Sequence, residues 1–465
     1  MLTQPDQGPL YRQIYDRVRS SIIDGRLRPG DRLPPTRLYA QQMGVARGTV
    51  DMAYAILAGE GYVETSGRAG TRVAAGIAAG RPPIRQATSR PGPPVTQGER
   101  PHSLLPLTPG VPAFDLFPRK LWAQLVRRHT RALRPIDMAY PDPQGSAALR
   151  EALAAHLAVS RGISCTPDEI IVTGGYQAAL GLVCRELVPA GAQAWVEDPG
   201  YSPQRSALRH VGAIPVGVPV DGEGLDVAAG IALAPDARLC VVAPAHQFPM
   251  GVALSLARRL QLLEWADRAG AWVLEDDYDG EFRYEGRPLP ALKSLDRNQR
   301  VFYAGTFSKT LFPGMRLGYL VAPPSQLDRF RDAVRLLEGG RPMLDQTVAA
   351  EFVADGHFAR HVKRMRSAYR SRRAALAGAL AARFGDAATI EQGAGGLHLM
   401  LRIAGGPGRL GALHWSSGEG LGAIAMTHIT DRADLADGVL VGFANVPERQ
   451  APAFAARLHA IVMER

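Results

Sequence analysis

Cysteines and lysines are scarce in this chain, and it has no long apolar run. The 465 residues include three cysteines, Cys165, Cys184 and Cys240, which lie far apart and form no CxxC pair. This spacing argues against a disulfide framework and a structural zinc site, so we expect no metal and three small buried side chains. No run approaches the roughly 20 apolar residues of a membrane helix, and the first residues hold no apolar signal core. We therefore expect a cytoplasmic protein without membrane contact.

The charge balance alone does not identify a partner. The chain carries 54 Lys+Arg against 44 Asp+Glu, a formal net charge of +10. Such a balance fits a polyanionic partner, but it also occurs where arginine simply replaces lysine on the surface. Only four of the basic residues are lysines, so the placement of Lys309 asks for an explanation. The length is sufficient for two or more domains.

Composition divides the chain into three parts. Residues 1–73, which we call the head, form a compact pattern of helices and strands. Residues 74–106 are rich in Gly, Pro, Ala and Arg and lack an apolar period. This is typical of a semi-extended linker, and an ordered arm lying on the next domain is the alternative. Residues 107–465, the body, hold most of the expected core.

In the body, helical patterns alternate with short β-rich runs. Buried strands that alternate with helices predict an α/β fold with a mostly parallel central sheet. A smaller α+β lobe is expected at about residues 327–465. The expected strands are 169–175, 193–198, 238–244, 271–277, 300–306 and 316–323, and an amphipathic helix is expected at 255–270.

The head shows three helical patterns followed by a hairpin. The second helix begins after two prolines, where Thr36 is expected to be the N-cap, and a tight turn at Gly44 leads to the third. Two short strands joined by residues 66–70 complete the pattern of a winged helix-turn-helix. Apolar residues at helical spacing predict the core: Leu10, Ile14, Val18 and Ile22 in the first helix, and Val50, Ala53, Tyr54 and Leu57 in the third.

The remaining face of the third helix begins with Arg47 and Thr49. A recognition helix enters the major groove by its N-terminal residues, so we expect Arg47 to contact a base or a phosphate. Arg37 begins the preceding helix, and Arg68 lies at the tip of the wing, within reach of the neighbouring minor groove. We therefore expect a double-stranded DNA operator as the partner, with these four residues at the interface.

The head resembles the DNA-binding domain of the GntR superfamily of bacterial transcription regulators. The resemblance covers about residues 8–73 and is carried by GDRLPPTRLYA…MGVARGTVDMAYAILAGEGYVETSGRAGTRV. Thr36 and Ala46 replace the serines that often precede the DNA-facing arginines, and Gly48 replaces a frequent Asn. Because Ala46 has no hydroxyl, it offers no side-chain bond to a phosphate. A winged helix used only for protein contact is the alternative.

Lys309 stands in the stretch TFSKTLFPGMRLGYLVAP, residues 306–323. Two hydroxyls, Thr306 and Ser308, precede it, and Arg316, which we expect to be buried, follows. An aldehyde forms a Schiff base with a lysine amine. A phosphate is bound by hydroxyls, amides and a guanidinium. A lysine near a helix start with these neighbours points to pyridoxal 5'-phosphate as the cofactor.

Three further stretches supply matching parts. EDDYDGEF (275–282) ends a strand, where we assign Asp276 to the pyridinium nitrogen and Tyr278 to the 3-oxygen of the cofactor; an exposed acidic loop is the alternative. In EDPGY (197–201), Tyr201 is placed to stack on the cofactor. VTGGYQAAL (172–180) reads as a strand, a turn and a helix start that can receive a phosphate; a plain strand-to-helix turn is the alternative. Its expected ligands are Gly174, Gly175, Tyr176 and Gln177.

The order of these motifs resembles that of fold type I aminotransferases, over residues 107–465. The resemblance implies a homodimer in which Tyr140 reaches the phosphate in the partner subunit. The usual NP.G motif, whose Asn contacts the 3-oxygen, is replaced by APAHQFPMG. His246 and Gln247 are both candidates there, and Gln247 is included among the cofactor contacts. The usual arginine that clamps the substrate carboxylate is replaced by Leu440, which leaves Arg205, or no arginine, for that role.

Joined in one chain, the two halves resemble the MocR/GabR group of transcription regulators. The resemblance implies a regulator whose body binds pyridoxal 5'-phosphate through Lys309 and senses an amine, an amino acid or the cofactor itself. Dimers of this group are typically head-to-tail. The missing clamp arginine favours a regulator over a working aminotransferase with a DNA-binding head; a regulator without cofactor is the second alternative. The basic helix at residues 360–376 is expected to pack, with an auxiliary DNA surface as its alternative.

Overall fold

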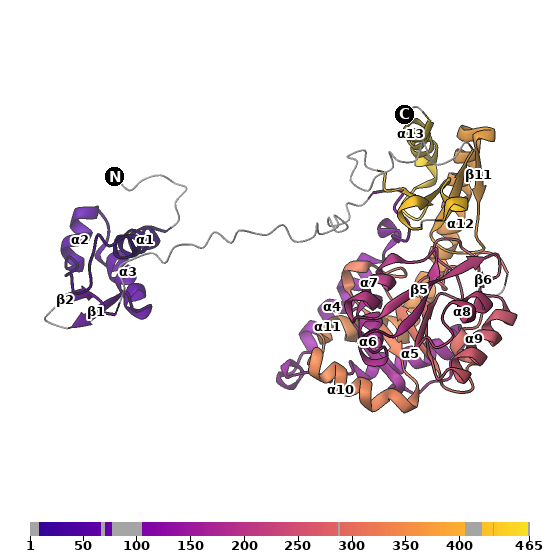
Figure 1. Ribbon diagram of the computed structural model, residues 1–465. Coiled ribbons are helices and arrows are strands. Elements are labelled where there is room, and N and C mark those ends of the chain that lie inside the picture. Colours follow the sequence, from indigo (N-terminus) through magenta and orange to yellow (C-terminus); the bar gives the residue numbers. More distant parts are fainter. Residues whose placement is uncertain are drawn as a thin grey trace. The chain divides into compact units, whose positions relative to one another are not determined.

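The computed structural model describes residues 9–66, 70–76, 105–286, 289–404, 421–430 and 432–463. The chain forms two compact units, residues 1–100 and 101–465, and each is described by itself (Figure 1). None of the helices in the described ranges is long and apolar enough to span a membrane.

The first unit contains three helices and a hairpin. Helices α1 (Leu10–Ile23), α2 (Thr36–Met43) and α3 (Arg47–Gly59) precede β1 (Val63–Ser66) and β2 (Gly70–Val73), which pair antiparallel. The apolar faces of α1 and α3 meet in one core. All the core residues predicted for these helices are buried except Leu10, which is 42% exposed in the first turn of α1. The predicted winged helix-turn-helix is thereby confirmed.

The start of α2 differs from the prediction. Thr36 is the first helical residue, and Pro35 occupies the cap position, where no side chain bonds to the first amides. Proline suits this place because its ring fixes φ, which is −55° here. The helix ends as predicted at Gly44, whose φ of +66° is left-handed and favours a residue without a β-carbon.

The described part of the second unit is built on one sheet of eight strands, in the order β3-β10-β9-β8-β7-β4-β5-β6. From β9 to β5 neighbouring strands run parallel. Strand β10 lies antiparallel between β3 and β9, and β6 is antiparallel at the edge. The strands are β3 (Ile170–Thr173), β4 (Gln193–Asp198), β5 (Ile214–Asp221), β6 (Gly224–Leu225), β7 (Leu239–Val242), β8 (Trp272–Asp277), β9 (Val301–Thr306) and β10 (Gly318–Val321).

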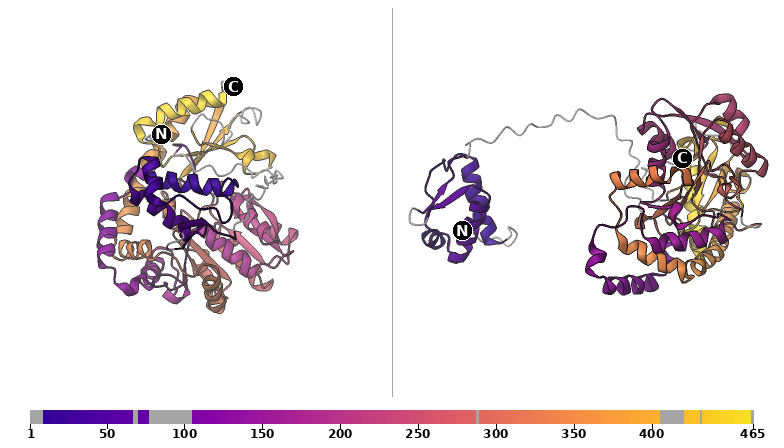
Figure 2. Two further views of the ribbon diagram at one scale, coloured as in Figure 1. Left: turned by 90° about the vertical axis from the view of Figure 1, so that its left-hand side faces the viewer. Right: turned by 90° about the horizontal axis from the view of Figure 1, so that it is seen from below.

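This sheet confirms the predicted α/β class and all six predicted strands. Side chains alternate between its faces, as the period of a strand requires. Ile171 packs with α6 (Tyr176–Leu187), α7 (Ser202–His210) and α10 (Leu327–Leu337), whereas Ile170 and Val172 pack toward α5 (Ala147–Ser160) and α11 (Met343–Ala354). Helices α8 (Val227–Leu233) and α9 (Leu256–Arg268) pack against the part of the sheet that contains Trp195. Figure 2 shows helices on both faces of the sheet.

A smaller lobe follows, with a described sheet of four strands in the order β11-β12-β14-β13. Its elements are α12 (His357–Phe384), β11 (Ala388–Glu391), β12 (His398–Ile403), β13 (Ile424–Ala425), β14 (Gly438–Gly442) and α13 (Ala451–Met463). The predicted start near residue 327 is too early, because α10 packs on α6, and α11 packs on α5 and α4 (Arg119–Ala132). The lobe therefore begins with α12.

The first described residues of the body run along this lobe. Leu107 accepts a hydrogen bond from the Gly442 amide and donates its own amide to Leu421, each at 2.8 Å. The Asn445 side chain donates to the Val111 carbonyl at 3.0 Å. Residues 107–113, which follow the linker sequence directly, are thus fixed to the lobe before the chain reaches α4.

The basic helix α12 uses its arginines inside the body. Arg366 reaches Glu281, Arg372 bonds with Asp115, and Arg373 lies 3.3 Å from Glu285. Arg364 and Arg370 bond to the carbonyls of Leu116 and Tyr284. These contacts favour the packing interpretation of the helix over an auxiliary DNA surface.

Candidate functional site

The DNA-facing residues predicted in the head lie at the starts of two helices. Arg47 is the first residue of α3, and its side chain is 67% exposed, with Nε 3.4 Å from Asp51 Oδ2. An ion pair this exposed contributes little to stability, so the guanidinium can exchange it for a phosphate or a base. Arg37 is exposed and Thr49 half-buried. Arg68 lies outside the described residues.

Lys309 follows β9 in a turn. The Thr306 side-chain oxygen accepts the Ser308 amide at 3.1 Å, and its hydroxyl donates to Ser308 Oγ at 3.0 Å. The predicted helix start is not formed: residues 308–310 are a turn, and Phe312 is extended with φ −157°. The physical reason is Pro313, because a proline lacks an amide hydrogen and forces the residue before it out of the helical region.

The amine of Lys309 lies in a buried, negatively charged setting. Burial lowers the pKa of Lys309, and the charges of Asp279 and Asp276 oppose this. Gly110 faces the amine: a β-carbon there would lie 3.0 Å from Nζ. A lysine with a lowered pKa is more often uncharged, and the uncharged amine is the nucleophile. The setting therefore suits covalent bonding to an aldehyde.

Asp276 presents an unpaired carboxylate oxygen at the end of β8. The residue is 5% exposed, and its Oδ2 accepts a hydrogen bond from Gln204 Nε2 at 3.4 Å. Within the described residues, Oδ1 is buried without a hydrogen-bond partner. Burial raises the pKa of Asp276 to about 8. A buried acceptor without a donor is costly, and a protonated ring nitrogen would supply that donor.

Two arginines approach the glycine turn between β3 and α6. A β-carbon on Gly175 would lie 3.8 Å from the guanidinium of Arg316, and one on Gly174 would overlap that of Arg341. Gly175 itself has φ +90°, a conformation that favours glycine. Arg316 is exposed rather than buried as predicted, in a left-handed turn with its own φ at +49°. Two guanidiniums at a helix N-terminus suit a phosphate.

The side chains of Tyr278, Tyr201 and Gln247 all have hydrogen-bonding partners. The Tyr278 hydroxyl lies 3.0 Å from His246 Nδ1, and the Tyr201 hydroxyl accepts a bond from Gln177 Nε2 at 3.1 Å. The Gln247 amide nitrogen donates to Pro199 and Phe248, while its oxygen accepts the Met250 amide. All polar atoms of Gln247 are thus engaged by backbone.

Tyr140 does not join the site within its own chain. It is 99% exposed, at the end of a segment in which residues 131–140 are all exposed.

The two positions considered for a carboxylate clamp are unsuited to it. Leu440 is fully buried in β14 and packs with Met400 and Ile424. The Arg205 guanidinium lies 3.5 Å from Asp198 and so already has a carboxylate partner.

Three residues that sequence reasoning left out of the site lie in it: Gln204, Asp279 and Arg341. Asp279 follows Tyr278 directly in the acidic run EDDYD, which was a signal that it belongs with Asp276. Gln204 also bonds to the Tyr176 hydroxyl at 3.0 Å and so joins α7 to α6. Arg341 comes from the loop before α11, and only the fold brings it to Gly174.

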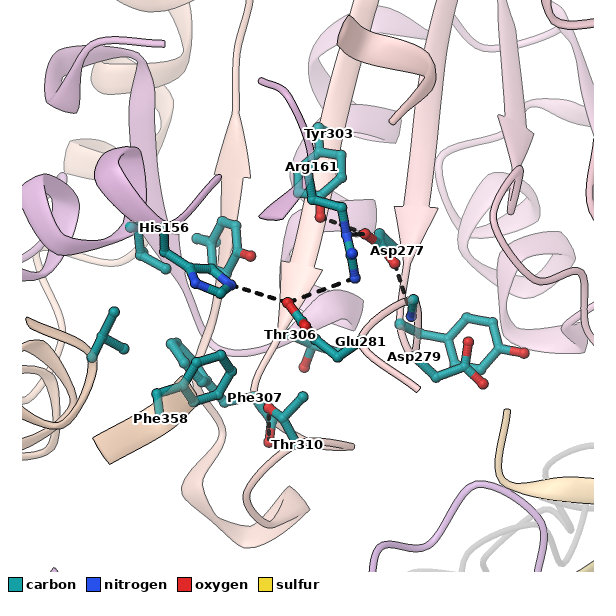
Figure 3. A pocket seen from close by; sticks show the side chains of 15 residues that line it. His156, Arg161, Asp277, Asp279, Glu281, Tyr303, Thr306, Phe307, Thr310 and Phe358 are labelled. Atoms are coloured by element: carbon teal, nitrogen blue, oxygen red, sulfur yellow. Dashed lines mark hydrogen bonds and ion pairs between the residues drawn. The ribbon is translucent and has the colours of Figure 1, made fainter. Parts of the chain in front are cut away.

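A second polar cluster supports this region from the other face of the sheet (Figure 3). Arg161 Nε bonds to Asp277 Oδ2 at 2.5 Å, and the Tyr303 hydroxyl donates to the same oxygen at 2.6 Å. His156 lies 3.0 Å from Glu281. Burial alone would raise the pKa of Glu281, but His156 and Arg161 lower it to about 2. These bonds fix residues 277–281, the loop that carries Tyr278 and Asp279.

The described residues fit pyridoxal 5'-phosphate. Its aldehyde matches the Lys309 amine, its ring nitrogen matches the unpaired Asp276 oxygen, and its phosphate matches the two arginines at the glycine turn.

Comparison with known proteins agrees with this reading. Residues 104–404 match the family model "Aminotransferase class I and II", and residues 10–73 match "Bacterial regulatory proteins, gntR family". The chain is 36% identical to the probable rhizopine catabolism regulatory protein MocR of Rhizobium meliloti, over 85% of this chain and 82% of that protein. It is 34% identical to the HTH-type pyridoxine biosynthesis transcriptional regulator PdxR of Corynebacterium glutamicum, over 94% and 92%.

Among solved structures, the body resembles a kynurenine aminotransferase from Pyrococcus horikoshii in complex with PMP. The TM-score is 0.69 at 27% identity, and the match covers 78% of this chain and 91% of that one. The chain therefore belongs to the family of HTH-type transcriptional regulators that join a gntR-type DNA-binding domain to an aminotransferase class I and II domain. It is a DNA-binding regulator of the MocR type, and the cofactor of its body is pyridoxal 5'-phosphate.

Proposed function

We propose that the body senses a small amine, an amino acid or pyridoxal 5'-phosphate itself at Lys309 and thereby changes how the head binds its operator. The observation that carries the proposal is the buried Lys309 amine near Asp276 and Asp279, in the same chain as the exposed Arg47 at the start of α3. One relative is named for pyridoxine biosynthesis and another for rhizopine catabolism, which supports control by a small molecule.

The residues of the body have distinct proposed roles. The uncharged Lys309 amine bonds to the aldehyde of the cofactor, whose ring supplies an electron sink. Asp276 accepts the ring N–H, Tyr278 donates to the 3-oxygen, and Tyr201 covers the ring. Gln247 holds the loop beside the site through its backbone bonds. The phosphate is bound by Thr306, Ser308, Arg316, Gly174, Gly175, Tyr176 and Gln177, with Arg341 as an addition.

In the head, Arg37, Arg47 and Thr49 contact the operator, and Arg68 extends the contact from the wing. The parts we propose are a head at residues 1–73, a linker at 74–106 and a body at 107–465. The family matches at residues 10–73 and 104–404 support these bounds. Since the target is DNA, we infer that the protein acts in the cytoplasm.

We further propose a homodimer. The exposed segment 131–140 carries large apolar side chains that the other described residues leave exposed: Leu133, Ile136, Met138 and Tyr140, by 41%, 70%, 72% and 99%. Exposed apolar groups that lie together mark interaction surfaces. In a dimer Tyr140 would reach the phosphate in the partner subunit. An effector then acts by binding two dimer states unequally, because only a difference in affinity shifts their balance.

The test is a spectral titration of the cofactor-loaded protein with a panel of amines and amino acids, run beside an operator-binding assay. We expect one class of ligand, or the cofactor, to change both the visible absorbance and the operator affinity. Lys309→Ala should abolish both responses and the borohydride-trapped adduct. Sustained amino transfer from a donor to 2-oxoglutarate, unaffected by Arg47→Ala, would favour the aminotransferase alternative. The buried Leu440 argues against that outcome.

A further inference from the structure

His246 is buried beside the loop that carries Tyr278. The residue is 7% exposed. Its Nδ1 lies 3.0 Å from the Tyr278 hydroxyl oxygen and 3.0 Å from an Asp279 carboxylate oxygen. Asp279 is 2% exposed, and within the described residues neither of its carboxylate oxygens has a hydrogen-bond partner, so its contact with His246 is electrostatic. One imidazole nitrogen thus meets a phenol and a buried carboxylate.

The backbone around the imidazole is shaped to receive it. A β-carbon on Gly251 or Gly393 would lie 3.4 Å from His246 Nε2, and one on Gly396 would overlap the ring. Gly251 and Gly396 have φ of +69° and +83°. Gly251 follows β7, whereas Gly393 and Gly396 lie between β11 and β12. Glycines from two distant loops therefore leave room for this ring.

These contacts indicate which group donates the hydrogen in the bond between His246 and Tyr278. An imidazole nitrogen without hydrogen would accept the phenol hydrogen of Tyr278, whereas an N–H would donate to the phenol oxygen. The Asp279 carboxylate at 3.0 Å favours the hydrogen on Nδ1, because a negative charge stabilises a donor beside it. The Tyr278 oxygen then accepts from His246, and its own hydrogen stays available for another acceptor. Donation to the phenol oxygen also strengthens the phenol as a donor.

We propose that His246, held by Asp279, is a positioning residue that directs the phenol hydrogen of Tyr278 toward the 3-oxygen of pyridoxal 5'-phosphate. The inference rests on the proposed function, in which Tyr278 donates to that oxygen. His246 and Gln247 were both candidates for the contact with the 3-oxygen. The inference assigns this role to His246, which acts through Tyr278. Gln247 has no polar atom left for the task, because backbone groups engage both its nitrogen and its oxygen.

The experiment compares His246→Asn with His246→Leu in the full chain loaded with pyridoxal 5'-phosphate. The two side chains have nearly the same shape, so any loss of packing is common to both. The Asn amide places a donor near the position of Nδ1, whereas Leu has none. Without that donor, the phenol hydrogen of Tyr278 turns to the Asp279 carboxylate, and the 3-oxygen loses its hydrogen bond.

The readouts are the pH midpoint of the visible absorbance change and the dissociation constant of the cofactor. A hydrogen bond to the 3-oxygen favours its deprotonated form. We expect His246→Leu to raise the midpoint by about one pH unit and to weaken cofactor binding roughly two- to tenfold. His246→Asn should stay close to the wild type. His210→Leu, at the exposed end of α7, is the matched surface control.

Other charged groups face this cluster and remain the same in each variant. They are Asp276 on β8, Glu197 on β4, Lys309 after β9, His398 on β12 and Arg283 beside the loop. Any effect of these groups on the pH midpoint of the absorbance change would therefore be the same in His246→Asn and His246→Leu.

A double-mutant cycle separates positioning from packing. In a Tyr278→Phe background, His246→Leu should cause no further shift of the midpoint, since His246 acts through the phenol. Equal shifts in His246→Asn and His246→Leu, or an unchanged midpoint and affinity in His246→Leu, would overturn the inference. The proposed function would survive that result, because it fails only if the wild type gives no borohydride-trapped adduct at Lys309.

Discussion

The α-carbon of Gly110 faces the amine of Lys309, so that a β-carbon on Gly110 would lie 3.0 Å from Nζ and 3.6 Å from Cε. Gly110 lies in the segment that follows the linker sequence and is bonded to the lobe through Leu107 and Val111. A chemical change at Lys309 therefore acts by direct contact on the part of the body that is nearest in sequence to the head. This contact gives the proposed sensing a physical starting point.

Gly110→Ala should weaken cofactor binding. Alanine adds a methyl group beside the amine and must also adopt φ +71°, which costs about 1–2 kcal/mol. Gly191→Ala is the matched control, because Gly191 has φ +81° and nothing within 4 Å of a β-carbon. We expect a similar loss of thermal stability in both variants but a raised dissociation constant for pyridoxal 5'-phosphate only in Gly110→Ala. Equal cofactor affinity in the two variants would contradict the crowding argument.

Arg47→Ala should weaken operator binding. Loss of one arginine contact to a base or phosphate costs about 1–3 kcal/mol, and loss of a phosphate contact lowers the slope of log affinity against log salt by about one. The measurement is fluorescence anisotropy with operator DNA at several salt concentrations. Arg12→Ala, an exposed arginine of α1 that also pairs with an acidic residue, controls for the change in net charge. If both variants bind equally well, α3 does not read the operator through Arg47.

Asp276→Asn should change how the stability of the cofactor-free protein depends on pH. Burial raises the pKa of Asp276 from 3.8 to about 8. The folded state therefore holds this proton more tightly than the unfolded state. The stability it contributes is complete below about pH 4 and is lost as the pH rises toward 8.

Thermal unfolding between pH 5 and 8 tests this, since the part of the unfolding free energy due to Asp276 should fall by about 4 kcal/mol across the range. Asp276→Asn should lessen the fall but not abolish it, because burial also raises the pKa of Glu197 to about 8 and of Glu275 to about 7. Asp328→Asn, at a side chain 99% exposed, should leave the wild-type profile unchanged. An unchanged fall in Asp276→Asn would show that Asp276 is ionised in the folded protein.

The sequence predicted those parts of the fold and site that depend on local pattern. The core of α3 and the six strands follow from residue types at fixed spacing, and the same kind of pattern carries the roles of Lys309 and Asp276, which stay predictions. The reversed direction of β10 did not, because strand direction depends on pairing with β3, which lies about 150 residues away. Arg341 and Gln204 were missed for the same reason: their partners Gly174 and Asp276 are distant in sequence.

Errors also arose where backbone geometry decides the outcome. Arg316 was expected to be buried, but it is exposed in a turn where its own φ is +49°. Thr36 has the chemistry of a cap, yet Pro35 takes that position. Residue type indicates which contacts are chemically possible, whereas the backbone decides which of them form.

Ile136→Asp should weaken self-association. Ile136 is 70% exposed among other apolar residues of the segment 131–140, and a carboxylate placed in an apolar interface would lose its hydration without a partner. Val159→Asp is the control, since Val159 is 91% exposed on α5, outside that segment. Sedimentation equilibrium should show a dimer dissociation constant at least about tenfold higher for Ile136→Asp, and a wild-type value for Val159→Asp. Because Tyr140 is proposed to complete the phosphate site in the partner subunit, cofactor affinity should fall when dimerisation is lost. A variant that stays dimeric while losing cofactor would place the dimer interface elsewhere.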